Sequence, residues 1–198
     1  MARIDKVPER EAGPFGRLAY RLSRHRFGEV AEPLTVMAHH PKLLLVYGML
    51  ELGFERSDLI DERLKSLAVL KAATMVACEF CIDIGSALGS AEGITEDQLR
   101  ELADFERSEA FSPLEKLVLR YAVAMTRTPA DVPDELFDAL REHFSEAQLV
   151  ELTAAIALEN YRARFNHAFG MGSQGFSEAS FCAAPETLAA VTTTNGGE

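Results

Sequence analysis

Helix-start signals followed by apolar residues at helical spacing recur along this 198-residue chain. In residues 112–115, Ser-Pro-Leu-Glu, the serine can cap a helix, the proline suits its first turn and the glutamate can reach back to the cap. The apolar residues that follow fall on one helix face: Leu114, Leu117, Val118, Tyr121 and Met125. No stretch of useful length alternates apolar and polar residues as a strand would. The sequence therefore predicts an all-α fold, a helical bundle.

The same signals place the other helices. We expect them over residues 15–27, 33–52, 59–77, 78–91, 98–105, 134–143 and 145–167. Two stretches, residues 94–102 and 144–152, resemble each other, since each has a Thr or Ser cap, a Gln three residues later and the same following Leu and Glu. One capping box used twice is the simpler interpretation, because capping boxes recur in proteins. A duplicated helical unit is the alternative.

Length and composition indicate one domain with two arms. Hydrophobic residues make up 47% of the chain and charged residues 26%, which are ordinary values for a globular protein. We expect an N-terminal arm over residues 1–14, which are charged and irregular, and a helical domain over residues 15–175. A polar C-terminal arm would then occupy residues 176–198.

The formal net charge of −11 makes nucleic acid and anionic membrane surfaces poor partners, because an acidic surface repels phosphate. The most apolar run, residues 43–50, is far shorter than the ~20 residues of a membrane-spanning helix. The N-terminus lacks the apolar segment of a secretory signal, so we expect a cytoplasmic protein. In that reducing compartment a close pair of cysteines indicates metal binding or redox chemistry rather than a structural disulfide.

Cys78 and Cys81 form such a pair. Residues three apart share a helix face, so both thiols would point the same way with Cα atoms ~5 Å apart, a separation that a disulfide tolerates. If the pair begins a helix, the unpaired N–H groups and the helix dipole favour the thiolate, which is the attacking species. An attacked cysteine would become a sulfenic acid, and its partner could then close the disulfide.

Other interpretations of the pair are weaker. Zinc needs about four ligands, and the remaining cysteine, Cys182, stands alone with no His pair at short spacing. We therefore expect no metal site and interpret Cys182 as a packing or exposed residue. A thioredoxin-like fold would place the pair after a strand, whereas the preceding residues indicate a helix. Two small buried residues in a packed turn are the alternative to redox chemistry.

The stretch around the pair resembles a known family. Residues 64–73 and the following residues 78–83, Cys-Glu-Phe-Cys-Ile-Asp, resemble the core helix pair of carboxymuconolactone decarboxylase/alkylhydroperoxidase D (AhpD)-like proteins. Residues 155–167 resemble the closing helix of that family. The resemblance implies an AhpD-like helical bundle assembled as a homotrimer or homohexamer, and a peroxidase cycle of the peroxiredoxin type. In that cycle Cys81 is peroxidatic and attacks the hydroperoxide, Cys78 is resolving, and a lipoyl-type dithiol or a small thiol is the reductant, without a cofactor.

The sequence departs from the family at two positions. AhpD-like peroxidases have a Glu where this chain has Ser66, and a His where this chain has Gly85. Those two groups relay the proton that leaves the attacking thiol, and neither serine nor glycine moves a proton in that way. Another group must serve here, or the activity is weak or different.

Three side chains are candidates to replace the relay or to shape the pocket. His167 shares a helix face with Asn160 and Arg164 and could act as base if that helix covers the pair; a partly exposed structural histidine is the alternative. Asp83 lies two residues after the second cysteine, so on a regular helix it points away from the thiol, as a solvated or salt-bridged carboxylate would. Glu79, between the cysteines, would tune only the charge of the pocket.

Three functions follow. The leading hypothesis is a thiol-dependent hydroperoxide reductase, an antioxidant oxidoreductase. The second is lactone decarboxylation, with Arg162, Arg164 and His167 as acid/base group and anion clamp; the cysteine pair argues against it, because decarboxylases of the family do not require one. The third is a non-catalytic helical oligomer, a ligand-binding or redox-sensing module that kept the fold and lost the relay.

Overall fold

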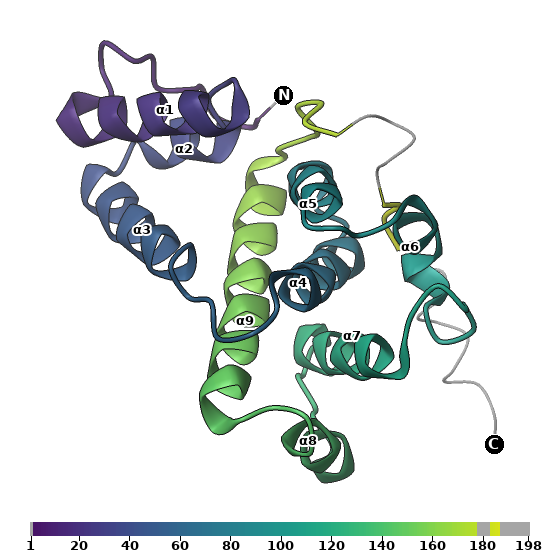
Figure 1. Ribbon diagram of the computed structural model, residues 1–198. Coiled ribbons are helices and arrows are strands. Elements are labelled where there is room, and N and C mark those ends of the chain that lie inside the picture. The colour runs from purple at the N-terminus through teal and green to yellow at the C-terminus, as the bar shows by residue number, and fades with distance from the viewer. Residues whose placement is uncertain (1, 178–182, 187–198) are drawn as a thin grey trace.

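The computed structural model describes residues 2–177 and 183–186, and all regular elements within these residues are helices (Figure 1). In chain order they are α1 (Gly13–Phe27), α2 (Glu32–Met37), α3 (Pro41–Phe54), α4 (Glu62–Val76), α5 (Glu79–Ala91), α6 (Glu96–Glu101), the 3₁₀ helix η1 (Leu102–Asp104), α7 (Pro113–Thr126), α8 (Asp134–Arg141) and α9 (Glu146–Phe169). The predicted all-α bundle is confirmed.

The single helix expected over residues 33–52 is wrong, because the chain forms two helices there. Residues 38–40 separate α2 from α3, and Pro41 is the first residue of α3. A proline disfavours helical backbone in the residue before it, and His40 accordingly adopts φ −125° and ψ 83°. The His40 ring accepts the Leu43 N–H at 3.1 Å and so caps the new helix.

Helix α4 lies at the centre of the bundle, between α5, α7 and α9 (Figure 1). Leu67, Ala68 and Ala72 are fully buried, and the alanines let neighbouring helices approach closely. Leu67 belongs to an apolar cluster shared with α5 and α6, whereas Ala68 and Ala72 belong to a second cluster shared with α7, α8 and α9. The core therefore consists of two apolar clusters, and α4 contributes residues to both.

Three helices begin with the same device. Thr95, Ser112 and Ser145 each cap a helix, and the residue three positions later returns a side-chain hydrogen bond to the cap. The similarity between residues 94–102 and 144–152 is therefore a shared capping box. The helices that follow differ greatly in length, with 6 residues in α6 and 24 in α9.

Helices α1, α2 and α3 form a unit to one side of the bundle (Figure 1). Only one of the 14 residues of α3, Leu44, is buried. We define the α1/α3 apolar face as the large apolar residues of these two helices that are exposed in the single chain: Phe15, Leu18, Leu22, Leu43, Leu45, Val46, Met49, Leu50 and Leu52. An exposed patch of this kind marks a surface for association.

The chain on either side of the helices packs against them. The Arg3 N–H donates to the Phe169 carbonyl at 2.7 Å, and the Val7 N–H donates to the Thr35 carbonyl at 3.1 Å. After α9 the chain crosses α5, where Met171 and Ala183 enter the apolar cluster that includes both cysteines. The limits proposed for the two arms stay a prediction. None of the described helices combines the length and apolarity needed to cross a membrane.

Candidate functional site

The cysteine pair lies where α4 gives way to α5. Helix α4 ends at Val76, and Ala77 adopts a left-handed conformation (φ 55°, ψ 41°) that turns the chain. Cys78 then caps α5, since its Sγ accepts the Cys81 N–H at 3.3 Å. The two sulfur atoms are joined as a disulfide, with Cα atoms 5.3 Å apart. The structure thus has the shared face and the short separation that the three-residue spacing indicates.

Asn166 of α9 faces both sulfur atoms. Its Nδ2 lies 3.3 Å from Cys81 Sγ and 3.8 Å from Cys78 Sγ, and its side chain is buried. Sequence reasoning chose the neighbouring His167 instead. The signal was present, because Ile156, Ala163 and Asn166 repeat at the spacing of the buried stripe of α9. An amide N–H directed at sulfur stabilises a thiolate but cannot accept a proton.

Both sulfur atoms are closed off in the single chain. Cys78 is 2% exposed and Cys81 is 5% exposed, within a cluster that contains Phe80, Met171 and Ala183. The packing around them is not wholly apolar, because the Asn166 amide reaches them. A reagent that reaches the sulfurs must therefore pass the segments that cover α5, which include the chain after α9.

Asp83 is buried and forms no salt bridge with the described residues, which corrects the expectation of a solvated or salt-bridged carboxylate. Its side chain is 1% exposed, and its oxygens accept six hydrogen bonds from the backbone and hydroxyl groups of residues 173–177. Burial would raise the pKa of this carboxyl, but the hydrogen bonds from Ser177, Phe176 and Ser173 outweigh burial and lower it. Asp83 thus holds the chain that follows α9 against α5.

The other two candidate side chains are not brought to the sulfurs. His167 is exposed on α9, one residue past the buried Asn166. Glu79 is also exposed, and its carboxylate lies beside Gly172, where an added Cβ would sit 3.2 Å from Oε2. Roles for His167 and Glu79 in the chemistry stay a prediction.

The two positions that carry the relay in AhpD-like peroxidases serve other purposes in this chain. The Ser66 hydroxyl donates to the Glu92 carboxylate. A Cβ at Gly85 would lie 3.2 Å from Leu70 Cδ1, so α4 and α5 approach each other too closely there for a histidine unless Leu70 moves. In this chain Ser66 therefore bonds to the residue that follows α5, and Gly85 packs against Leu70 of α4.

Comparison with known proteins identifies the family of this chain. The model of the carboxymuconolactone decarboxylase family matches residues 45–124, which include the cysteine pair. The uncharacterized protein YnjA of Escherichia coli K12 is 37% identical over 166 residues, which cover 83% of this chain and 88% of YnjA. The chain belongs to the carboxymuconolactone decarboxylase family.

Solved structures share the fold of this family member. The debrominase Bmp8 superposes with a TM-score of 0.78 at 21% identity, covering 90% of this chain and 96% of Bmp8. The AhpD core of an uncharacterized peroxidase-related protein from Ralstonia eutropha JMP134 gives a TM-score of 0.77 at 16% identity, covering 88% of this chain and 94% of that one. At these identities the likeness shows the fold alone.

The acid/base group and anion clamp predicted for a decarboxylase, Arg162, Arg164 and His167, do not gather at one site. Both Arg162 terminal nitrogens and its Nε are engaged by carboxylates, with Nε 2.8 Å from Glu51 and one terminal nitrogen 3.3 Å from Glu159. Arg164 donates to Asn160 and to the loop after α7. His167 is exposed, so the three groups do not converge on one ligand position.

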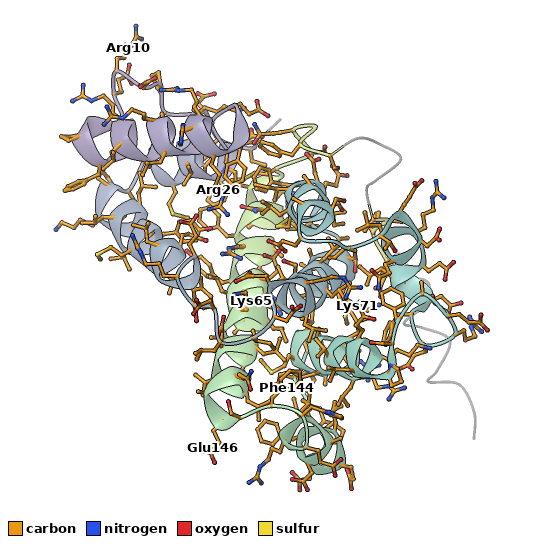
Figure 2. The ribbon with its side chains drawn as sticks, in the orientation of Figure 1. Arg10, Arg26, Lys65, Lys71, Phe144 and Glu146 are labelled. Carbon is orange, nitrogen blue, oxygen red and sulfur yellow. A yellow bond between two sulfur atoms is a disulfide. The ribbon has the colours of Figure 1, made fainter. Side chains whose placement is uncertain are left out.

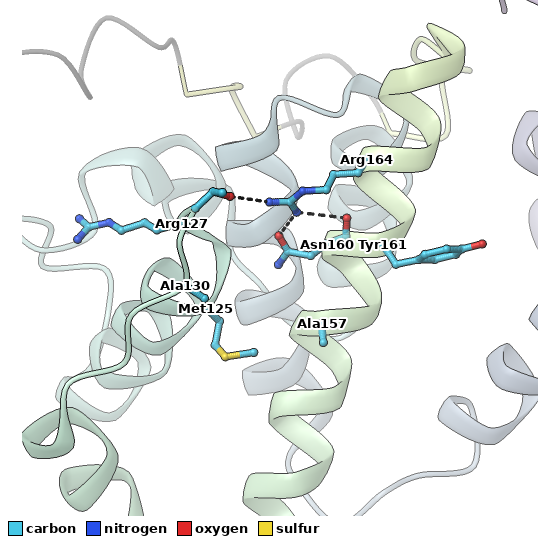
Figure 3. Close-up of a pocket in the computed structure, with 8 residues that line it drawn as sticks. Met125, Arg127, Ala130, Ala157, Asn160, Tyr161 and Arg164 are labelled. Carbon is cyan, nitrogen blue, oxygen red and sulfur yellow. Dashed lines mark hydrogen bonds between the residues drawn. The ribbon is translucent and has the colours of Figure 1, made fainter.

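A hollow of about 390 Å³ lies between α9 and the loop after α7 (Figure 3). Its lining residues are Met125, Arg127, Thr128, Ala130, Ala157, Asn160, Tyr161 and Arg164. Figure 3 shows Arg164 spanning the hollow to the loop while Arg127 points away from it. The lining residues do not include either cysteine or Asn166. In the described part of the chain, no cluster of three metal-ligating side chains occurs.

Glu159 is a buried carboxyl that sequence reasoning missed. Its side chain is 3% exposed; Oε2 accepts from Arg162, and Oε1 has no hydrogen-bond partner among the described residues. Burial raises its pKa to about 7 against the opposing effect of Arg162, and Glu51 adds to the rise. The carboxyl therefore keeps its proton to a much higher pH than an ordinary glutamate and titrates near neutrality.

We expect this raised pKa to make stability depend on pH. The unfolded carboxyl loses its proton near its usual value of 4.5 and the folded one near 7, so stability falls as pH rises across that window. Glu159→Gln should remove the fall and gain about 3 kcal/mol relative to the parent between pH 4.5 and about pH 8. Urea unfolding at both pH values measures it, with exposed Glu142→Gln as control. An equal pH dependence in parent and variant would contradict the assignment.

Proposed function

We propose that this chain is a thiol-dependent hydroperoxide reductase that uses Cys78 and Cys81. The observation that carries the proposal is the placement of the two sulfurs, bonded to each other at the N-terminus of α5 with the Asn166 amide 3.3 Å from Cys81 Sγ. A helix N-terminus and an N–H donor both favour the thiolate over the thiol. The match to the carboxymuconolactone decarboxylase family includes the pair, and membership supports peroxidase-related or decarboxylase-like activity.

The proposed oxidative half-cycle has two steps. The Cys81 thiolate attacks one oxygen of the hydroperoxide, the O–O bond breaks, and the departing alkoxide takes up a proton to leave as the alcohol. Cys81 is then a sulfenic acid. The Cys78 thiolate attacks the Cys81 sulfur and displaces hydroxide, which leaves as water once protonated, so the pair is oxidised to the disulfide.

A dithiol returns the pair to its reduced form. One thiolate of a lipoyl-type dithiol, or of a small thiol, attacks the Cys78 sulfur and releases the Cys81 thiolate. A second thiol then attacks the mixed disulfide, so the reductant leaves oxidised and Cys78 regains its thiol. The Asn166 amide stabilises the Cys81 thiolate as the leaving group here, through the same hydrogen bond that stabilises it as the attacking group.

The proposal accounts for the missing relay. Ser66 and Gly85 have no group that accepts a proton in this role. Hydrogen-bond donors at the sulfurs lower the free energy of the thiolate directly, so deprotonation needs no dedicated base beside the thiol. The cost is that the donors must be positioned before the substrate arrives, which the burial of Asn166 ensures.

The neighbour Bmp8 widens the set of substrates to test. Bmp8 is a debrominase, and a variant with one cysteine replaced by alanine has been solved with 2,3,4-tribromopyrrole; it covers 91% of this chain with a TM-score of 0.74 at 22% identity. This supports small-molecule chemistry at a cysteine on this fold. A brominated pyrrole therefore belongs beside alkyl hydroperoxides among the substrates tested.

We expect Cys81→Ser to abolish hydroperoxide consumption with a dithiol reductant, because it removes the attacking sulfur. Cys78→Ser should undergo one oxidation and then stop, with Cys81 trapped as a sulfenic acid that dimedone labels. Mass spectrometry of the parent after mild peroxide should show Cys78 linked to Cys81. Cys182, which lies outside the described residues, provides the control Cys182→Ser, which should keep turnover. Full turnover in Cys81→Ser would leave the non-catalytic module as the better explanation.

Asn166 and His167 can be separated by thiol alkylation. In the reduced Cys78→Ser background, Asn166→Leu should slow alkylation of Cys81 near neutral pH by about tenfold, since it removes a hydrogen bond to a charged group. His167→Ala is the matched control one residue away on an exposed position, and should leave the rate unchanged. The opposite pattern would return the role of base to His167.

We further propose that the chain works as a homotrimer or homohexamer joined through the α1/α3 apolar face. Its nine large apolar residues are each between 37% and 56% exposed in the single chain, which leaves a large apolar surface uncovered. A second copy of the same chain fits this surface best, because a patch of this size is rare on proteins that stay monomeric.

The assembly is testable by light scattering after size exclusion. We expect a mass of three or six times 21.8 kDa for the parent chain. Val46→Glu places a charge within the α1/α3 apolar face and should reduce the mass toward that of one chain. Val150→Glu is the matched control, because Val150 is 69% exposed on α9 and lies outside the face. Unchanged assembly in Val46→Glu would show that the copies meet elsewhere.

A further inference from the structure

Lys71 is the most deeply buried cation of the described chain. Its side chain is 2% exposed and comes from α4 (Figure 2). The ammonium donates to the Leu102 carbonyl at 3.1 Å and lies 4.8 Å from the centre of the Phe105 ring. These contacts come from a carbonyl and a ring face, so they leave the positive charge without an anion from the helices around it.

The anion comes from the chain after α9. Glu186 Oε1 lies 2.5 Å from Lys71 Nζ and 3.2 Å from the Thr74 hydroxyl oxygen. The Glu186 N–H donates to the Thr74 carbonyl at 3.0 Å, and three residues earlier the Ala183 N–H donates to Ser86 Oγ at 3.1 Å. Residues 183–186 therefore bind α4 and α5 as an extended segment, with the carboxylate inserted.

The other buried lysine of α4 shows how different this arrangement is. Lys65 pairs with Glu151 of α9 at 2.9 Å and with Glu62 of its own helix at 2.7 Å (Figure 2). Its buried carboxylate partner, Glu151, is 3% exposed and is held within the packed helix α9. The carboxylate of Lys71 comes from residue 186, in a described stretch that has no helix or strand, so its departure would not require a helix to unfold.

We propose that Lys71, Thr74 and the Phe105 ring form a carboxylate-binding pocket that Glu186 fills in cis. The ligand class is a carboxylate on a short aliphatic chain, because the pocket already holds the end of a glutamate side chain. A buried ammonium requires an anion, so an external carboxylate replaces Glu186 when the segment lifts. Ala183 packs in the same cluster as both cysteines, so such a ligand would bind beside the segment that covers them.

A free carboxylate must compete with Glu186, which is tethered to the same chain, and this competition sets the concentration of free carboxylate needed for binding. A segment linked to the same chain competes as if present at about millimolar concentration or more. Free carboxylates should therefore bind the parent weakly, and bind far better once the Glu186 carboxylate is neutralised. Glu186→Gln keeps the size of the side chain and removes its charge, so it replaces the ion pair with a much weaker competitor at the least disturbance.

Propionate is the probe, because it reproduces the end of a glutamate side chain. We expect Glu186→Gln to lower Tm by about 5 °C, and sodium propionate at about 100 mM to restore at least half of that loss. Sodium chloride of equal ionic strength should restore little. In the double variant Lys71→Met/Glu186→Gln the two salts should act alike. Equal responses to both salts in Glu186→Gln, or a propionate response that survives Lys71→Met, overturns the proposal.

Acylation of Lys71 provides a second measurement that does not depend on global stability or on activity. Peptide mapping after brief acetylation should show Lys71 protected in the parent, labelled at least about fivefold faster in Glu186→Gln, and protected again by propionate. Lys65 is the internal reference, since its carboxylates are unchanged in every variant. Equal labelling of Lys71 in the parent and in Glu186→Gln would refute the pocket.

Discussion

The burial of α4 is the constraint on which the rest of the structure depends. Because α5, α7 and α9 pack around this helix, its buried polar side chains, Lys65, Lys71 and Thr74, must each meet a partner inside the protein. Lys65 is matched by Glu151 of α9, and Lys71 by Glu186 from the end of the described chain. Segments far apart in the sequence are thereby fixed against one central helix.

The same helix positions the sulfur atoms. Its end at Val76 and the turn at Ala77 make Cys78 the cap of the next helix, so the pair lies where unpaired N–H groups gather. Helix α9 packs along α4 and brings Asn166 to that point. The environment of the thiols is therefore determined by the start of α5 and by the packing of α9. The two positions of the family's proton relay, Ser66 and Gly85 here, do not contribute to it.

Sequence reasoning predicted the parts of this structure that depend on local spacing. The helices, the shared face of the two cysteines and the capping boxes all follow from residues a few positions apart. The break before Pro41, at His39 and His40, was also local, and was missed because apolar residues resume directly after it. In that case the restriction that proline places on the preceding residue outweighs the apolar pattern.

The contacts that sequence reasoning missed join distant segments. His167 attracts attention as a titratable residue, yet the 3.6-residue repeat turns Asn166 inward and His167 outward. Asp83 was expected in solvent, because nothing near it in the sequence reveals the loop ninety residues later that it binds. Tertiary packing decides which residues contact the cysteine sulfurs and the Asp83 carboxylate, and residue spacing in the sequence does not predict that packing.

The six hydrogen bonds to Asp83 fix the backbone of an irregular segment, residues 173–177. Residues 173–177 have no helix or strand, yet four successive backbone N–H groups, from Gln174 to Ser177, converge on the oxygens of one carboxylate. Their amide protons are thus sequestered as those of a sheet would be, and the backbone takes its course from a side chain instead of from a neighbouring strand. The Asp83 carboxylate therefore accepts the main-chain hydrogen bonds that a neighbouring strand would otherwise accept.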